Sequence, residues 1–150
     1  MKNTPFLWLL AFISGSLIPV QAAANAALSR SIGVNVPFSA LILFLVAGIA
    51  SAVGALLAGA PVPAAGSLLA APWWSYLGGL IVAFYVFTIT FLVPRIGVGT
   101  SISLVVTGQI VAALTIDNFG LLRSLTFPVT PARLLGAAMM AVGVFLALRR

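Results

Sequence analysis

Residues 37–59 read PFSALILFLVAGIASAVGALLAG, an apolar stretch without a single charged side chain. An α-helix rises about 1.5 Å per residue, so about 20 residues cross the ~30 Å hydrocarbon core of a bilayer. This stretch is long enough to span a membrane as one helix. It therefore predicts an integral membrane protein.

Four further apolar segments meet or approach the same length. With the first, they predict an all-α membrane protein of five transmembrane helices in a single domain over residues 1–150, at 6–28, 37–59, 73–93, 97–116 and 132–148. The interval 60–72 holds Pro61, Pro63 and Pro72, which leave too few uninterrupted residues for a sixth span. We expect a loop at the membrane surface there, with Trp73 and Trp74 anchoring the next helix.

A cleavable signal peptide is the alternative for the first segment. Lys2 precedes an apolar run, and residues 20–26 resemble a cleavage site. The run continues to Leu28, however, and is longer than the apolar core of a signal peptide. We therefore expect this segment to be kept as the first helix.

The composition excludes most soluble classes of protein. The chain is 63% hydrophobic and 5% charged, whereas a soluble domain carries about a quarter charged residues. Its seven cations are scattered at the ends of apolar runs, without the basic patch that nucleic acid requires. There is no Cys or His, and Asp117 is the only carboxylate. We therefore expect no enzyme activity, no metal, no cofactor and no nucleic-acid partner.

The charges give almost no preferred orientation. Five spans put the termini on opposite sides, with Lys2, Arg123 and Arg133 on one side against Arg30, Arg95, Arg149 and Arg150 on the other. Orientation follows the excess of Lys and Arg in short cytoplasmic loops, and three against four is nearly even. Either other features settle the orientation, or copies insert both ways and pair as an antiparallel homodimer. Many transporters are built from two inverted halves, and this chain has the size of one half.

Ordered motifs run along nearly the whole chain. The first helix carries Gln21-x3-Asn25-x2-Leu28-x-Arg30-x2-Gly33. Later motifs are Trp73-Trp74, Gly78-Gly79, Ala83-Phe84-Tyr85, Pro94-Arg95-Ile96-Gly97, Gly108-Gln109, Asp117-Asn118-Phe119-Gly120 and Arg133-Leu134-Leu135-Gly136. With these motifs the sequence resembles the short, five-helix YdcZ-like family of the drug/metabolite transporter superfamily.

The resemblance implies a class of protein and no particular substrate. It implies a bacterial inner-membrane exporter related to ten-helix transporters made of two such halves. Asn118 stands where the family pattern leads us to expect a histidine, so the chain lacks that group as a proton switch. In size the chain is also similar to the small multidrug resistance proteins, which use a glutamate in their first helix. Here the corresponding region offers Gln21 and Asn25, and no Glu exists.

Two amides on the first helix are the leading candidates for a substrate site. Gln21 and Asn25 are four residues apart and share a helix face with Ser14. Amides inside an apolar helix cost free energy unless they find partners. They either bond neighbouring helices or line a polar cavity near the midplane. Pro19 frees a backbone carbonyl and predicts a bend in this helix.

The later helices offer further candidates. Tyr85 and Thr88 lie together on the third helix, where Tyr85 either packs or stacks on substrate. On the fourth, we expect Gln109 to line the cavity, because threonine hydroxyls on the other face are satisfied by their own helix backbone. Asp117 is a turn residue, a partner of Arg123 or Arg133, or a site that couples transport to a proton or cation.

These observations favour a secondary transporter that exports a small neutral or amphipathic molecule by alternating access. Its partners are membrane lipid, the substrate, and a second copy of the chain in inverted orientation, or an inverted paralogue. Two alternatives remain open from the sequence: a non-transporting membrane subunit that stabilises a larger partner, and a passive channel.

Overall fold

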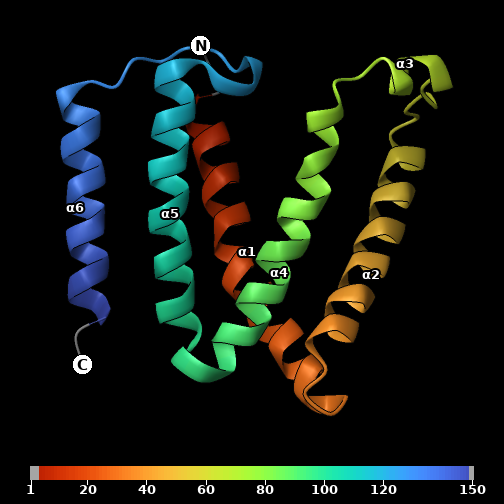
Figure 1. The fold of residues 1–150 in the computed structure, drawn as a ribbon, viewed down its shortest axis with the longest axis horizontal. Coiled ribbons are helices and arrows are strands. Elements are labelled where there is room, and N and C mark those ends of the chain that lie inside the picture. The colour runs from red at the N-terminus through yellow and green to blue at the C-terminus, as the bar shows by residue number, and fades with distance from the viewer. Residues whose placement is uncertain (1–3, 149–150) are drawn as a thin grey trace. The chain divides into compact units, whose positions relative to one another are not determined.

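The computed structural model describes residues 4–148, with side chains for residues 5–146. These residues form helices and no strand; Lys2, Arg149 and Arg150 lie outside them. The elements are α1 (Thr4–Ser31), α2 (Val36–Leu57), α3 (Ala65–Leu69), η1 (Trp73–Tyr76), α4 (Leu77–Ile96), α5 (Val98–Phe119), η2 (Leu121–Arg123) and α6 (Pro131–Leu148) (Figure 1). They group into two compact units, Met1–Arg95 and Ile96–Arg150.

The prediction of a multi-span helical membrane protein is confirmed. By length and hydropathy, four helical segments can cross a membrane: Pro5–Ser31, Val36–Leu57, Trp73–Ile96 and Val98–Phe119. The fifth predicted span, 132–148, is also an apolar helix, but its described apolar part, Pro131–Leu146, is shorter. The fold is thus four membrane-length helices and one shorter apolar helix.

The interval between α2 and α4 contains only short helical turns. The five-residue α3 is too short to cross a bilayer, and η1 precedes α4. The Tyr76 hydroxyl donates to the Leu68 carbonyl oxygen at 2.6 Å, which ties the two turns together. Trp73 is exposed in η1, at the start of the span where an interfacial anchor is expected.

In the first unit, α1 and α2 form a hairpin. Gly33 and Val34 turn the chain with positive φ, and the Asn35 side chain caps α2 by accepting from the Phe38 N–H at 3.2 Å. Few side chains of the described chain are buried, and in this unit the buried apolar ones are Ala22, Ala26, Ala40, Val86, Ile89 and Val93. The three alanines let helix backbones approach closely.

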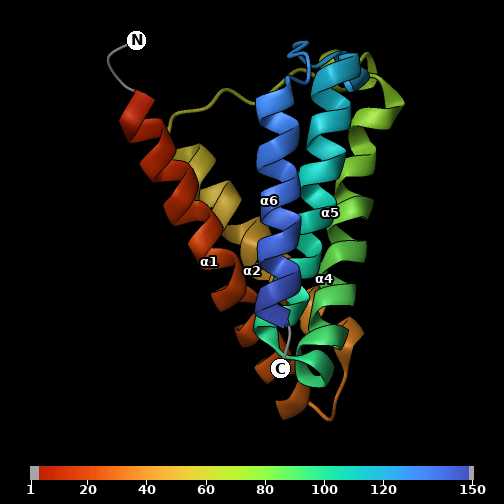
Figure 2. The same cartoon turned by 90° about the vertical axis from the view of Figure 1, so that its left-hand side faces the viewer.

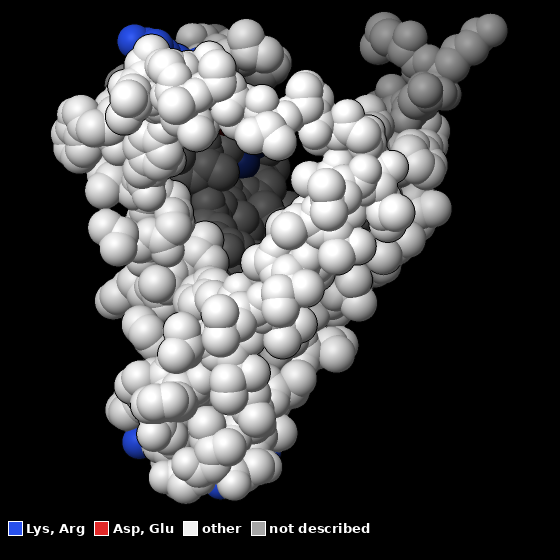
Figure 3. All heavy atoms as spheres, turned by 90° about the vertical axis from the view of Figure 1, so that its right-hand side faces the viewer, with Lys and Arg blue, Asp and Glu red and all other residues white. Residues whose placement is uncertain are grey.

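Large apolar side chains cover the outer surface of the helices. Phe12, Leu56 and Phe84, for example, are 73%, 79% and 72% exposed. On the face drawn in Figure 3, basic atoms of the outer surface lie toward the helix ends, and the surface along the helices is uncharged. This distribution is the one expected where lipid is the solvent.

The connection between α4 and α5 is shorter than we predicted. The predicted spans 73–93 and 97–116 leave residues 94–96 between them, but α4 continues through Pro94 to Ile96 and only Gly97 separates it from α5. Pro94 stands in the last turn of α4, which ends at Ile96. The proline removes one backbone hydrogen bond of the helix there, and only two helical residues follow it. Gly97 has φ 84° and ψ 158°, a conformation essentially restricted to glycine.

In the second unit, α5 and α6 are antiparallel neighbours that lie side by side in both ribbon views (Figure 1 and Figure 2). The helix α5 ends in a left-handed cap at Gly120, with φ 58° and ψ 33°. A Cβ atom on Gly120 would lie 2.7 Å from the Thr126 Oγ1, so the loop is folded tightly over this glycine.

Candidate functional site

A groove between α1 and α2 contains the two predicted amides. Its volume is about 400 Å³, and Gln21 and Asn25 are the polar residues among those that line it. The other walls are small or aliphatic: Ala24, Leu28, Ile42, Leu43, Val46, Ala47 and Ala50. Both amides lie beyond the middle of α1, toward the Arg30 end of the helix.

Asn25 joins α1 to α4. Its side chain is buried, with 3% of the residue exposed, and its Nδ2 donates to the Thr90 Oγ1 at 2.5 Å. Thr90 is 1% exposed. This bond uses the amide nitrogen and leaves the Asn25 Oδ1 as an acceptor, which is buried and has no hydrogen-bond partner among the described residues.

Gln21, one turn earlier on α1, has an unpaired hydrogen-bond donor among the described residues, whereas Asn25 has an unpaired acceptor. The Gln21 Nε2 is a buried donor that finds no partner within residues 5–146. A buried polar group without a partner costs about 1–3 kcal/mol. Two residues that line the groove, one turn apart on α1, therefore hold a buried donor and a buried acceptor that are unpaired among the described residues.

The other predicted residues occupy different places. Tyr85 lies on α4 with a buried hydroxyl that has no partner in the described chain, but it does not line the α1–α2 groove. Ser14 is exposed on α1, and Gln109 is exposed on α5 in the second unit. The structure therefore brings Gln21 and Asn25 together and places Ser14 and Tyr85 outside their groove.

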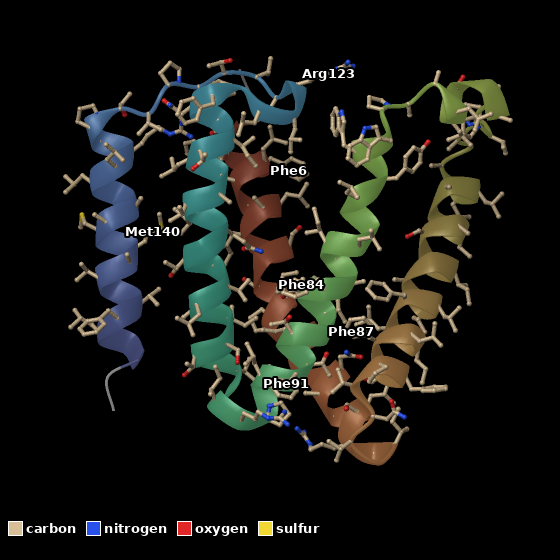
Figure 4. The ribbon with its side chains drawn as sticks, viewed as in Figure 1. Phe6, Phe84, Phe87, Phe91, Arg123 and Met140 are labelled. Atoms are coloured by element: carbon tan, nitrogen blue, oxygen red, sulfur yellow. The ribbon has the colours of Figure 1, made fainter. Side chains whose placement is uncertain are left out.

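Thr88 lines a second groove, of about 410 Å³, between the start of α2 and α4. Its aromatic walls are Phe84, Phe87 and Phe91, which follow one another along α4 (Figure 4). Arg95 lies 3.5 Å from the centroid of the Phe91 ring and donates to the Phe91 carbonyl oxygen at 2.6 Å. That carbonyl lies within the last turns of α4, so the arginine covers the end of the helix.

Thr90 is the site residue that the sequence analysis missed. Other hydroxyls bond the backbone of their own helix, as Thr107 does to the Ser103 carbonyl oxygen at 2.9 Å. Thr90 instead accepts from Asn25, 65 residues away in the sequence. Its position four residues before Pro94 was the available signal. A helix proline frees the backbone carbonyl of that residue, and neighbouring helices and Ser or Thr side chains can satisfy such freed groups.

Asp117 lies outside both grooves, at the end of α5. Its Oδ2 pairs with the Arg133 Nη2 at 2.6 Å, and the two side chains are 31% and 37% exposed. The Arg133 Nη1 donates to the Phe127 carbonyl oxygen at 2.9 Å, and the Phe127 N–H donates to the Asp117 carbonyl oxygen at 2.9 Å. These bonds hold the α5–α6 loop against the end of α5. A role for Asp117 in coupling transport to a proton or cation stays a prediction.

One comparison identifies a family. A family model described as "Putative inner membrane exporter, YdcZ" matches residues 6–146, which include both grooves. No curated protein and no solved structure matches the chain. The description is that of an exporter and not of an enzyme.

Proposed function

Since the chain belongs to the YdcZ family of putative inner-membrane exporters, we propose that it exports a small organic molecule by alternating access. The transporter is a secondary one, and its working unit is two copies in opposite orientations in the bacterial inner membrane. Substrate enters the α1–α2 groove and meets Gln21 and Asn25.

The pair of unused amide atoms carries this proposal. The Gln21 Nε2 and the Asn25 Oδ1 are buried beside a groove and have no partner among the described residues. If they served only to tie helices together, each would be expected to find a partner within the fold. A ligand that visits the groove supplies the missing bonds and is recognised by them.

The nearly even charge distribution supports an antiparallel pair. In the predicted topology, Arg30 and Arg95 lie on one side of the membrane and Arg123 lies on the other. Because Gln21 and Asn25 lie toward the Arg30 end of α1, inversion of one copy places one groove toward each membrane face. Such a pair has the inverted symmetry of transporters that are built from two inverted halves.

Three further residues are candidates for the pathway. The buried Tyr85 hydroxyl on α4 and the exposed amide of Gln109 on α5 are available to a substrate or to the second copy. Asp117 is the only carboxylate available for coupling to a proton or cation.

Transport can be tested before the substrate is identified. Proteoliposomes that contain the full chain are loaded with a bacterial small-molecule extract, and mass spectrometry follows which solutes leave. We expect selective, saturable loss of one or a few solutes. Asn25→Leu should abolish this loss, whereas Ser16→Ala should not, because the exposed Ser16 hydroxyl bonds the Phe12 carbonyl of its own helix.

Each alternative predicts a different result. A passive channel would release all solutes below a size limit without saturation. A non-transporting subunit would release none above the level of empty liposomes. Either result contradicts the proposed function.

A further inference from the structure

We propose that the aromatic groove between the start of α2 and α4 holds an acyl chain of an anionic phospholipid, whose phosphate binds Arg95. The groove is lined by Val36, Pro37, Phe84, Phe87, Thr88 and Phe91. This inference concerns a lipid partner of the first unit and does not depend on the transport proposal.

Arg95 and the aromatic wall form one continuous surface. The Arg95 guanidinium lies over the Phe91 ring, 3.5 Å from its centroid, and Phe91 lines the groove. Phe84, Phe87 and Phe91 follow one another along α4 (Figure 4). Arg95 comes one turn after Phe91, on the same face of the helix. The positive charge therefore lies at one end of an apolar groove.

The row from Phe84 to Arg95 has the length of one membrane leaflet. At about 1.5 Å per residue, the helix rises about 16 Å between these two residues. The hydrocarbon core is about 30 Å thick, so one leaflet contributes about 15 Å of it. Val36 begins α2 and Arg95 stands in the last turn of α4, so this end of the groove lies at the membrane surface. The groove fits an acyl chain whose headgroup stays at that surface.

The positive charge at this end has no acidic side chain in its unit, because residues 1–95 contain no Asp or Glu. The helices α1 and α4 run in the same direction (Figure 1) and are joined by the bond between Asn25 and Thr90. Arg30 and Arg95 each follow one of these bonded residues by five positions, and both are exposed. The two arginines therefore lie near one level of the unit, where they attract an anionic headgroup.

The Arg95 guanidinium can bind a phosphate without leaving Phe91. Its Nη1 donates to the Phe91 carbonyl oxygen at 2.6 Å, and a guanidinium carries five N–H donors in all. Hydrogen bonds from arginine to phosphate are charge-assisted and stronger than neutral ones. A zwitterionic lipid also carries a positive group, which the two arginines repel. The site should therefore select lipids with a net negative charge.

Two lipids with identical acyl chains, phosphatidylglycerol and phosphatidylcholine, test the headgroup part of the proposal. Their binding to the delipidated full chain is measured by native mass spectrometry. We expect phosphatidylglycerol to bind at least about tenfold more tightly, since each arginine near the surface contributes about fivefold. Arg95→Gln should weaken phosphatidylglycerol by about fivefold and leave phosphatidylcholine nearly unchanged. Arg123→Gln is the control, because Arg123 belongs to η2 and does not line this groove.

A larger side chain in the groove tests the acyl-chain part. Thr88→Trp should fill the groove and weaken both lipids at least about fivefold. Leu80→Trp is the control on the same helix, because Leu80 is exposed and does not line the groove. If Thr88→Trp does not fold, Arg95→Gln still decides the proposal, since the exposed Arg95 side chain lies outside the packed residues.

Three results would overturn the proposal. Equal affinity of the wild type for the two lipids would show that the site does not select anionic headgroups. Equal losses in Arg95→Gln and Arg123→Gln would show attraction by net charge alone. If Thr88→Trp separates dimers and leaves lipid binding unchanged, the groove holds a second copy of the chain and not a lipid.

Discussion

Asn25 and Asn118 are chemically identical, yet they occupy opposite situations in the two units. The Asn118 Oδ1 accepts from the Val129 N–H at 3.0 Å and so ties the α5–α6 loop to the end of α5. The Asn25 Oδ1 is buried within α1 and has no partner in the described residues. The difference teaches that a polar residue at a helix end can complete the fold, whereas the same residue inside an apolar helix can keep an unpaired atom.

The contrast extends beyond these two residues. Around Asn118, the loop is fastened by the Asp117–Arg133 pair and by bonds to Phe127 and Thr130. Around Asn25, the single bond to Thr90 holds the amide in place and leaves its oxygen unused. Substitutions in the two units should therefore separate function from stability.

Leucine at each asparagine should give the largest difference. Asn25→Leu removes the unused acceptor and also the bond to Thr90. We expect transport to fall by at least about tenfold, while stability falls by less than about 1 kcal/mol, because an interhelical hydrogen bond in a membrane contributes about 0.6 kcal/mol. Asn118→Leu leaves the Val129 N–H without its partner and should cost about 1–3 kcal/mol, with little change in transport per folded protein.

Proteoliposome flux and thermal unfolding in detergent measure the two effects side by side. If Asn25→Leu destabilises the protein as much as Asn118→Leu does and leaves transport intact, the contrast between the two asparagines is wrong.

A substitution at Gly120 should have the next largest effect, on stability alone. Gly120→Ala forces a side chain into the left-handed region and against the Thr126 Oγ1, and we expect a loss of about 1–3 kcal/mol. Circular dichroism on heating measures the loss. Gly48→Ala is the matched control, because nothing lies within 4 Å of its added Cβ and its φ is not positive. Equal thermal-unfolding midpoints for the two variants would show that alanine is not strained at position 120.

The Asp117–Arg133 pair should have the smallest effect. Both side chains are about a third exposed, so the pair is screened by solvent and contributes about 0–1 kcal/mol. A double-mutant cycle with Asp117→Asn and Arg133→Gln measures the coupling free energy, which added salt should weaken. If Asp117→Asn instead abolishes solute movement with stability unchanged, Asp117 is a coupling residue and not only a fastening of the loop.

The sequence was sufficient to predict the long helices, because their apolar stretches approach or reach the length that spans a bilayer, as residues 37–59 do. It also placed Gln21 and Asn25 on one face of α1, since their spacing is that of a helical turn. It did not predict Thr90, because contact with Asn25 depends on how α1 and α4 cross and not on local spacing. For the same reason it grouped Thr88 with Tyr85, whereas only Thr88 lines the aromatic groove.

Opposite orientation of two copies is the central claim, and single cysteines test it most directly. Ser31, at the end of α1, and Ser124, after α5, are exposed. In the predicted five-span topology, they lie on opposite sides of the membrane in any one copy. The chain has no native cysteine, so Ser31→Cys and Ser124→Cys can be labelled separately in intact and in opened cells. The account predicts that each cysteine is labelled from both sides in comparable amounts. Labelling of each from one side only would contradict it.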